Sequence, residues 1–375
     1  MRILLLSEAA SIHTQRWATA LHERGVELAV FSLRDSNNDA YTKLGIPVIS
    51  AASSAAGQSS LWAKLGYLTA LGKLRRAIAA FRPDILHAHY ATSYGLLGAL
   101  AQFHPYIVSV WGADVYDFPH TAPFGKHLLR YVFRKADRVL STSHVMAKEA
   151  AKYTSKPFGV TPFGVDTSLF RPVHDVEPDL NLFGCVKALR KKYGIDVLLR
   201  AFSELVGNNP ARSLRLEIAG DGEDRAQIEA LAQELGIAER VTFKGFVPNG
   251  SLPTLYSRYL VSVFPSVLDS ESFGVVAVES MSCECPVIAS DVDGFRETVD
   301  DDNTGILVAR GEPHALAQAM QRFIDDPDMR SAMGKSGRAR VEQLYRWQDN
   351  VETMLEIYRS TLRQPQSEAD GASRK

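Results

Sequence analysis

The sequence is poor in cysteine and lacks a long hydrophobic run near its start. Its three cysteines, Cys185, Cys283 and Cys285, form no paired framework, and a reducing compartment fits them best. The first apolar run, residues 3–6, is too short for a secretory signal or a membrane span, so we expect a cytoplasmic protein. With 46% hydrophobic and 23% charged residues among 375, the composition excludes a disordered, collagen-like or disulfide-stapled chain and predicts two or three domains.

Two common phosphate-binding motifs are also missing. The loop and helix start that follow the first expected strand, residues 7–21, contain no glycine. A nicotinamide or flavin site needs GxGxxG there, so an oxidoreductase of that kind is excluded. No GxxxxGK[ST] occurs, which excludes a P-loop NTPase. Nucleic acid is not an expected partner, because the net charge is -1 and basic residues do not interleave with aromatic ones.

The first half of the chain has few acidic residues relative to basic ones, and the second half has the opposite imbalance. Residues 1–170 carry 18 Lys and Arg against 11 Asp and Glu, whereas residues 171–375 carry 24 against 32. Opposite balances indicate two units with different roles. The basic half could face anionic lipid or a phosphate-bearing substrate, and uneven surface charge without a function explains the counts equally well.

Short apolar or β-branched segments alternate with segments of helical period along both halves. The expected strands are residues 2–7, 27–33, 46–51, 85–90, 106–111 and 138–143, and then 180–186, 214–220, 241–246, 260–266 and 286–291. Such alternation predicts βαβ units with parallel sheets covered on both faces. The pattern restarts near residue 180, after a Pro- and Asp-rich stretch, 161–179, which we interpret as a linker. We therefore expect an α/β protein with two Rossmann-like domains, 1–165 and 166–345, and a cleft between them; 364–375 is expected to be a disordered tail.

The most informative pattern lies in residues 266–291. A strand ends at a loop there, and we expect a helix from about Ser272, with Ser270 or Ser272 as the N-cap. Helix N-termini bind phosphate through their dipole and their unpaired N–H groups. The amides expected to face a ligand are those of Phe273, Gly274 and Val275.

Two carboxylates accompany this helix start. Glu271 and Glu279 are eight residues apart, which on a helix is about 12 Å along the axis and about 80° in rotation. They are too far apart to act together on one small group, but they could bind the two ends of an elongated ligand that has phosphates between two sets of hydroxyls. A nucleotide sugar has this layout, and ordinary surface glutamates are the alternative interpretation.

The segment from Glu271 to Glu279 resembles the E-x7-E motif of retaining GT-B glycosyltransferases of family 4. The resemblance extends over nearly the whole chain, and it implies a GT-B architecture whose last helix, 346–363, packs back on the first domain. The other segments that resemble the family are 164–172 (its linker), 219–224 (a glycine turn), 241–248 (the nucleobase segment), 291–297 (the loop before the final strand) and 314–347 (the C-terminal region).

The resemblance also implies roles for single residues. Glu279 would bind the ribose hydroxyls, Glu271 the hydroxyls of the donor sugar, and the amides of 273–275 the sugar or the diphosphate. The family has two cations five residues apart for the diphosphate, a spacing that Lys187 and Lys192 keep. Further members of the expected donor site are Gly220 in the glycine turn and Val247 in the nucleobase segment, with Arg190 and Lys191 as alternative cations.

In the first half, His87 and His89 end an expected strand and lie on the same side of it, because side chains alternate. No further cluster of ligands joins them, so we expect no metal site. The resemblance implies a functional histidine in this pair, and we favour His89, which would position hydroxyls near the reacting carbon, over His87. Asp114 follows the next strand and could steer an acceptor hydroxyl, or it could be a turn or cap residue.

The loop before the first expected helix departs from the family. Family members often have two glycines where this chain has Ala9, Ala10 and Ser11, so His13 or Arg16 would have to supply side-chain contacts instead.

These features together predict a retaining glycosyltransferase that moves a sugar from a nucleotide-diphosphate donor, with UDP or GDP as the nucleotide, to a hydroxyl of a glycan or lipid-linked acceptor. We expect no bound cofactor. A nucleotide-sugar epimerase, a phosphorylase and a catalytically silent partner of another transferase are the alternatives. The basic helical stretches 61–83 and 124–139 could contact the inner face of a membrane, although ordinary core-packing helices show the same pattern.

Overall fold

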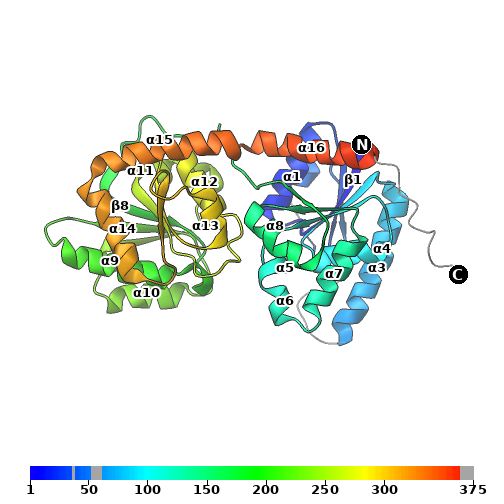
Figure 1. Cartoon of the computed structure of the whole chain (residues 1–375), viewed down its shortest axis with the longest axis horizontal. Coiled ribbons are helices and arrows are strands. Elements are labelled where there is room, and N and C mark those ends of the chain that lie inside the picture. The colour runs from blue at the N-terminus through cyan, green and yellow to red at the C-terminus, as the bar shows by residue number, and fades with distance from the viewer. Residues whose placement is uncertain (36–38, 52–60, 364–375) are drawn as a thin grey trace. The chain divides into compact units, whose positions relative to one another are not determined.

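The structure, a computed structural model, describes residues 1–35, 39–51 and 61–363, with side chains for all of these except 61–68. It divides into two compact units (Figure 1). Unit 1 comprises Met1–Thr161 and the segment from Asn350 onward, and unit 2 comprises Pro162–Asp349. The division at 161 precedes the expected boundary at 165, and the tail expected at 364–375 lies outside the described residues.

Unit 1 alternates strands and helices around one parallel sheet. Its elements are β1 (Arg2–Leu6), α1 (Ile12–Glu23), β2 (Glu27–Ser32), α2 (Asp39–Leu44), β3 (Val48–Ser50), α3 (Leu61–Phe81), β4 (Ile85–His89), α4 (Ser93–Ala101), β5 (Tyr106–Val110), α5 (Ala113–Tyr116), α6 (Phe118–Thr121), α7 (Gly125–Lys135), β6 (Arg138–Ser141), α8 (His144–Ala150), the 3-10 turn η1 (Ala151–Tyr153), β7 (Phe158–Val160) and α16 (Trp347–Arg363). The strand order is β3-β2-β1-β4-β5-β6-β7.

The core of unit 1 follows from the alternation of side chains along each strand. Leu4, Phe31 and Leu86 are fully buried on the face that α3, α4 and α7 cover. His87 points to the opposite face, where it contacts Tyr358 of α16. Within α16, the buried residues recur at the spacing of one helical face, which packs the last helix of the chain on unit 1.

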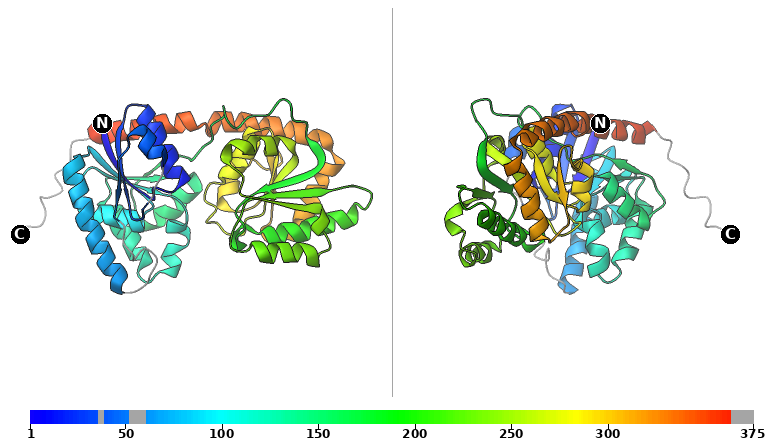
Figure 2. Two further views of the ribbon diagram at one scale, coloured as in Figure 1. Left: turned by 180° about the vertical axis from the view of Figure 1, so that it is seen from behind. Right: turned by 60° about the vertical axis from the view of Figure 1, so that its left-hand side comes forward.

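Unit 2 repeats the architecture of unit 1. Its elements are β8 (Asp179–Val186), η2 (Lys191–Tyr193), α9 (Ile195–Asn208), β9 (Arg215–Ala219), α10 (Arg225–Glu234), η3 (Ala238–Arg240), β10 (Val241–Gly245), η4 (Asn249–Ser251), α11 (Leu252–Arg258), β11 (Tyr259–Phe264), α12 (Val275–Ser282), β12 (Val287–Ser290), α13 (Asp293–Thr298), β13 (Gly305–Val308), α14 (Pro313–Asp325) and α15 (Pro327–Leu344). The strand order is β10-β9-β8-β11-β12-β13. Figure 2 gives two further views, in which helices lie on both sides of the sheet of each unit.

Two features differ from the expectations. The short strand β7 was not among the expected strands, and β13 was expected only through the resemblance, which places a final strand after 291–297. Runs of three or four residues carry too little alternation to be recognised. The interpretation of 161–179 as a linker is wrong for most of its length. The amide of Val165 donates to the carbonyl of Tyr345, and the carbonyl of Val165 accepts from the amide of Trp347, both at 2.8 Å. Phe170 is also buried, so this segment belongs to unit 2.

Each sheet contains one point at which the order of the strands reverses. In unit 1 this point lies between β1 and β4, and in unit 2 it lies between β8 and β11. Crossovers on the two sides of such a point run in opposite directions, so the loops at the carboxyl ends of these strands diverge and leave room for a ligand. The loops after β1, β4, β8 and β11 are therefore the places to search for a site.

Candidate active site

At the switch point of unit 2, two residues expected in the donor site contact each other. Lys187 follows β8, Glu271 lies in the loop after β11, and their side chains form an ion pair that is only 9% and 12% exposed. Ser266 also donates a hydrogen bond to Glu271 Oε2 at 3.4 Å. The pair forms because β8 and β11 are neighbours in the sheet, although 84 residues separate the two side chains in the sequence.

The second expected cation lies beside the first. Lys187 Nζ is 4.6 Å from the centroid of the Tyr193 ring, and Lys192 Nζ is 4.9 Å from the same centroid. Arg190 and Lys191, the alternative cations, are exposed, and Arg190 Nε lies 3.9 Å from Glu223 Oε1. The structure thus groups Lys187 and Lys192 around Tyr193, a residue that the sequence analysis did not single out.

The helix expected from Ser272 begins later than predicted. Helix α12 starts at Val275 and its N-cap is Gly274, with φ of 76°, so neither Ser270 nor Ser272 caps it. A side chain at 274 is excluded, because a Cβ there would lie 2.6 Å from the ring of Phe295. Glu271 therefore precedes the helix, and the helical spacing calculated for Glu271 and Glu279 does not apply.

The helix start nevertheless offers backbone donors. Among the described hydrogen bonds, none uses the amides of Phe273, Gly274 or Val275. The side chain of Phe273 is buried and its ring packs 5.4 Å from that of Tyr345, so only its amide can face a ligand. Three successive amides at a helix N-terminus form a site suited to an anion.

Of the remaining expected donor residues, Gly220 is in contact with Lys187. Glu279 is buried in α12 and accepts a hydrogen bond from the hydroxyl of Tyr256 at 3.4 Å. Gly220, with φ of 146°, lies against the backbone of Lys187, where a Cβ would be 2.0 Å from the carbonyl oxygen. Val247 is half-buried in the loop after β10.

In unit 1 the two candidate histidines have different environments. His87 is fully buried, with Nδ1 2.7 Å from the hydroxyl of Tyr358 and Nε2 2.8 Å from Oγ of Ser109, so both ring nitrogens contribute to the fold. His89 is 2% exposed, and its Nδ1 has no hydrogen-bond partner among the described residues. The ring of His89 lies 4.6 Å from that of Trp111. The two histidines therefore differ in whether their hydrogen bonds are satisfied within the unit.

The charge state of this cluster follows from its burial. Burial, followed by the charge of His13, lowers the pKa of His89 to about 3. Burial, followed by the charge of Arg16, lowers the pKa of His13 to about 4. His13 lies at the start of α1, beside Trp111 at 6.0 Å between ring centroids. Both histidines are neutral near pH 7, so they can exchange hydrogen bonds with hydroxyls but cannot act as cationic acids.

Asp114 does not have the environment of a residue that binds substrate directly. It is fully buried, and its carboxylate accepts hydrogen bonds from the amides of Ala91 and Gly112 at 2.8 Å and of Trp111 at 3.1 Å. Burial raises the pKa of Asp114, and these amide hydrogen bonds act in the opposite direction. These contacts favour the alternative that Asp114 is a turn residue, because its carboxylate connects the loops after β4 and β5.

The loop after β1, in which the family often has two glycines, is fixed by side chains. The amide of Ala9 donates to Oγ of Ser32 at 3.3 Å, and its carbonyl accepts from the hydroxyl of Tyr41 at 2.9 Å. The backbone of Ala9 is thus already hydrogen-bonded within the unit. Tyr41, on α2, carried no signal in the sequence that would connect it to this loop.

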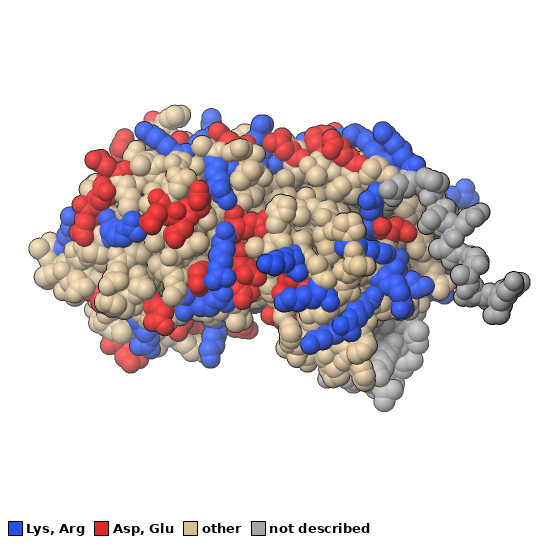
Figure 3. Space-filling model, viewed as in Figure 1, with Lys and Arg blue, Asp and Glu red and all other residues tan. Residues whose placement is uncertain are grey.

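One face of unit 1 is distinctly basic. Helices α3, α4 and α7, which cover the same face of the sheet, contain no Asp or Glu. On α7 the side chains of Lys126, Arg130 and Arg134 are exposed, and Phe124 immediately before it is 82% exposed. Figure 3 shows Lys and Arg gathered over the part of unit 1 that contains α7. Within residues 1–35, 39–51 and 61–363, no helix combines the length and apolar character needed to cross a membrane.

Two Rossmann-like units, each with polar side chains at its switch point, define the GT-B class of fold. Solved structures support this. Sucrose-phosphate synthase from Thermosynechococcus elongatus superimposes with a TM-score of 0.81 at 24% identity, covering 96% of this chain and 98% of that one. Anabaena Alr3699/HepE in complex with UDP superimposes with a TM-score of 0.80 at 20% identity, covering 96% of this chain and 100% of that one.

Comparison of the sequence identifies the family. Residues 166–340 match the model of glycosyl transferases group 1, and residues 2–143 match that of glycosyl transferase 4-like proteins. D-inositol 3-phosphate glycosyltransferase from Thermomonospora curvata is 31% identical to this chain, over 76% of this chain and 73% of its own length. The protein of the same name from Segniliparus rotundus is 27% identical, over 94% of this chain and 84% of its own length. The chain therefore belongs to the family 4 glycosyltransferases and is an enzyme that transfers a glycosyl group.

Proposed function

We propose that the chain is a retaining glycosyltransferase that uses a nucleotide-diphosphate sugar as donor and a hydroxyl group as acceptor. The observation that carries this proposal is the ion pair of Lys187 and Glu271 beside the unused amides at the start of α12. Lys187, Lys192 and these amides would bind the negatively charged diphosphate, and Glu271 would accept hydrogen bonds from the sugar hydroxyls. Glu279 would accept from the ribose hydroxyls. The UDP complex of Anabaena HepE supports uridine as the first nucleotide to examine.

The ion pair also suggests how the donor binds. When a diphosphate arrives, it competes with Glu271 for Lys187, and the released carboxylate can accept hydrogen bonds from the donor sugar. As the bond between the sugar and the diphosphate breaks, negative charge accumulates on the leaving group, and fixed cations and amides stabilise it. The acceptor oxygen forms the new glycosidic bond on the face that the leaving group vacates, and the leaving phosphate takes the acceptor proton. Neutral His89 would position a hydroxyl of the donor or the acceptor.

The transfer reaction tests the site assignment. Glu271→Ala and His89→Ala should each lower the rate of sugar transfer by about 100-fold, a typical effect of removing one stabilising group. Glu234→Ala changes an exposed carboxylate on α10 and is the matched control. Near-normal transfer by both site variants would contradict the proposal.

Nucleotide binding separates the roles of the two members of the ion pair. Glu271→Gln removes the competitor of the diphosphate for Lys187, so affinity for the nucleoside diphosphate should be retained or increased while transfer is lost. Lys187→Ala should weaken nucleotide binding by about 10-fold or more, because it removes a charge-assisted hydrogen bond. Titration calorimetry with UDP, GDP and ADP measures both effects and identifies the base. Equal loss of affinity in the two variants would contradict this assignment.

We also propose that the basic face of unit 1 contacts an anionic membrane at its inner surface, where a lipid-linked or surface glycan acceptor would be reached. Charge complementarity supports this, because α3, α4 and α7 lack carboxylates and each exposed cation near such a surface contributes about 1 kcal/mol. Sedimentation with phosphatidylglycerol vesicles should capture the protein in low salt. Lys126→Ala/Arg130→Ala should reduce capture, whereas Arg200→Ala/Lys335→Ala on unit 2 should not; equal capture of both double variants would contradict the contact.

A further inference from the structure

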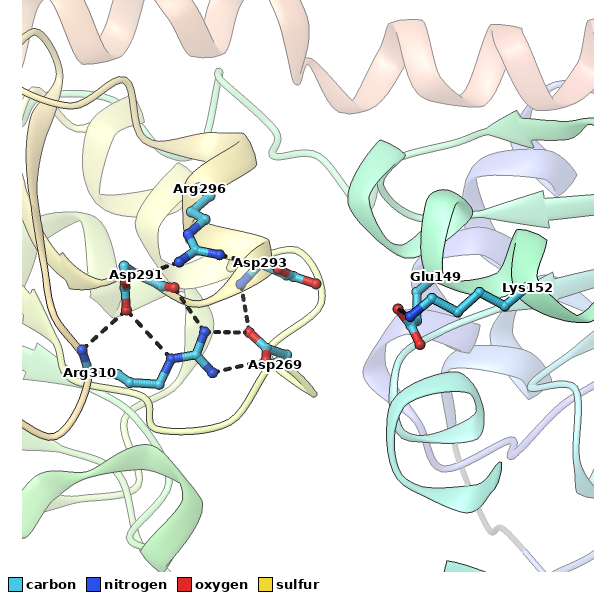
Figure 4. Close-up of polar contacts among 7 residues, drawn as sticks. All are labelled: Glu149, Lys152, Asp269, Asp291, Asp293, Arg296 and Arg310. Carbon is cyan, nitrogen blue, oxygen red and sulfur yellow. Dashed lines mark hydrogen bonds and ion pairs between the residues drawn. The ribbon is translucent and has the colours of Figure 1, made fainter. Parts of the chain in front are cut away.

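Three loops at the carboxyl edge of the unit 2 sheet meet around one arginine (Figure 4). Arg310 follows β13, and its Nη1 and Nη2 each lie 2.9 Å from an oxygen of Asp269, which is in the loop after β11. This is the bidentate geometry in which a planar guanidinium fixes a carboxylate in both position and orientation.

The same arginine also binds the loop after β12. Arg310 Nη2 donates to the carbonyl of Asp291 at 3.0 Å, and its backbone N donates to Asp291 Oδ1 at 3.1 Å. Arg296 binds the other oxygen of Asp291 at 2.9 Å, and the amide of Asp293 donates to Asp269 at 3.1 Å. We call these five residues, Asp269, Asp291, Asp293, Arg296 and Arg310, the Arg310 network.

The Arg310 network surrounds the backbone that carries Glu271. Asp269 is two residues before Glu271, and the amide of Gly294, one residue after Asp293, donates to the carbonyl of Glu271 at 3.0 Å. No side chain fits at 294, because a Cβ there would lie 2.2 Å from that carbonyl oxygen. The loop of Glu271 is therefore fixed from both sides by the loop after β12, and Arg310 joins the two.

The network contributes more to position than to stability. Asp269, Asp291 and Arg310 are each about a third exposed, and ion pairs in such positions contribute about 1 kcal/mol or less. Partial burial acts to raise the pKa of Asp269, but the hydrogen bonds from Arg310 and from the amide of Asp293 hold it below its ordinary value. The carboxylate is therefore ionised, and the network intact, throughout the neutral pH range.

We propose that Arg310 is a positioning residue for Glu271, acting through Asp269 on the loop after β11. The inference rests on the proposed role of Glu271 as the ligand of the donor sugar. A displacement of about 1 Å at a reacting centre can lower a rate by about 100-fold, so a modest loosening of this loop is sufficient. Lys187, Lys192 and Glu279 lie outside the network, whereas the amides of 273–275 follow Glu271 in the same loop, so nucleotide affinity should fall by a much smaller factor than kcat.

The test is a double-mutant cycle on sugar transfer with Glu271→Ala, Arg310→Ala and the double variant. Arg310→Ala should lower kcat by 10-fold or more, with a much smaller loss of UDP affinity and a nearly unchanged urea midpoint. Arg310→Lys, which loses the bidentate geometry, and Asp269→Asn should lower kcat to an intermediate extent. In the Glu271→Ala background, Arg310→Ala should have no further effect. Lys152→Ala, which removes the ion pair with Glu149 that Figure 4 also shows, is the control in unit 1.

The possible failures are distinguishable. If Glu271→Ala lowers transfer while Arg310→Ala and Asp269→Asn do not, the inference on Arg310 is overturned and the proposed function stands. If Arg310→Ala lowers kcat by the same factor with and without Glu271, Arg310 acts by another route and the inference is also overturned. If Glu271→Ala leaves transfer unchanged, the proposed function fails first, and the inference fails with it.

Discussion

At the scale of single residues, the buried histidines of unit 1 link stability to pH. His89 stays neutral in the folded protein down to a pKa of about 3, whereas an unfolded histidine takes up a proton below about pH 6.5. Between these values the unfolded state binds more protons, so the free energy of unfolding falls as the pH falls. The slope from one such residue is at most about 1.4 kcal/mol per pH unit.

His89→Gln should make this dependence shallower, because it removes one of the groups that titrate only after unfolding. Urea unfolding at pH 7, 6 and 5 measures the free energy directly. The variant should lose less stability between pH 7 and 5 than the parent. A parallel loss in the two proteins would mean that His89 is not held neutral by the fold.

Several residues of the candidate site were proposed from the sequence, and others could not be, for a physical reason. Glu271, Glu279 and Lys187 belong to segments whose pattern carries the family resemblance. Arg310 does not: what it contributes depends on Asp269 and Asp291 from other loops, and only the order of the strands brings those loops together. Tyr193 lies in the same loop as its partners Lys187 and Lys192, but no pattern in the sequence marks an aromatic residue there.

At the scale of elements, the loop of Glu271 depends on a close approach between two backbones. Gly294→Ala would place a Cβ against the carbonyl oxygen of Glu271, so one of the loops must move. We expect a loss of about 1–3 kcal/mol in the free energy of unfolding and a larger loss of transfer activity. Gly250→Ala, where a Cβ meets nothing within 4 Å, is the control and should retain both. Full activity in Gly294→Ala would contradict this description of the loop.

Helix α12 shows which part of an element the sequence can predict. Its apolar run and its place after a strand predicted a helix, which is present. Its start was wrong by three residues, because a serine that can cap a helix does so only where the chain has the required turn. Here the turn occurs at Gly274, which packs against Phe295 from a different helix, and no local pattern contains that contact.

At the scale of the whole molecule, the alternation of strands and helices was sufficient to predict two α/β units. It was not sufficient to assign α16, whose apolar face would suit either unit. The resemblance to the family implied its place, and the contact of Tyr358 with His87 identifies that place at atomic detail.

Tyr358→Phe tests how much that contact contributes. The variant keeps the ring but leaves His87 Nδ1 buried without a partner, which should lower the free energy of unfolding of unit 1 by about 1–3 kcal/mol. Hydrogen exchange of amides in β4 and β5 reports on unit 1 specifically. Tyr131→Phe, on α7, has no hydroxyl hydrogen bond among the described residues and should leave exchange unchanged. Unaltered protection in Tyr358→Phe would show that the hydrogen bond contributes nothing measurable.

The return of α16 to unit 1 has a consequence for synthesis on the ribosome. Domains generally fold as units, with the N-terminal one first as the chain emerges. Here the first 161 residues emerge without the helix that covers His87, and that helix follows only after all of unit 2 has been translated. The later-made unit can therefore complete its fold before the earlier one, and the surface around His87 waits for its covering helix until Pro162–Asp349 has been made.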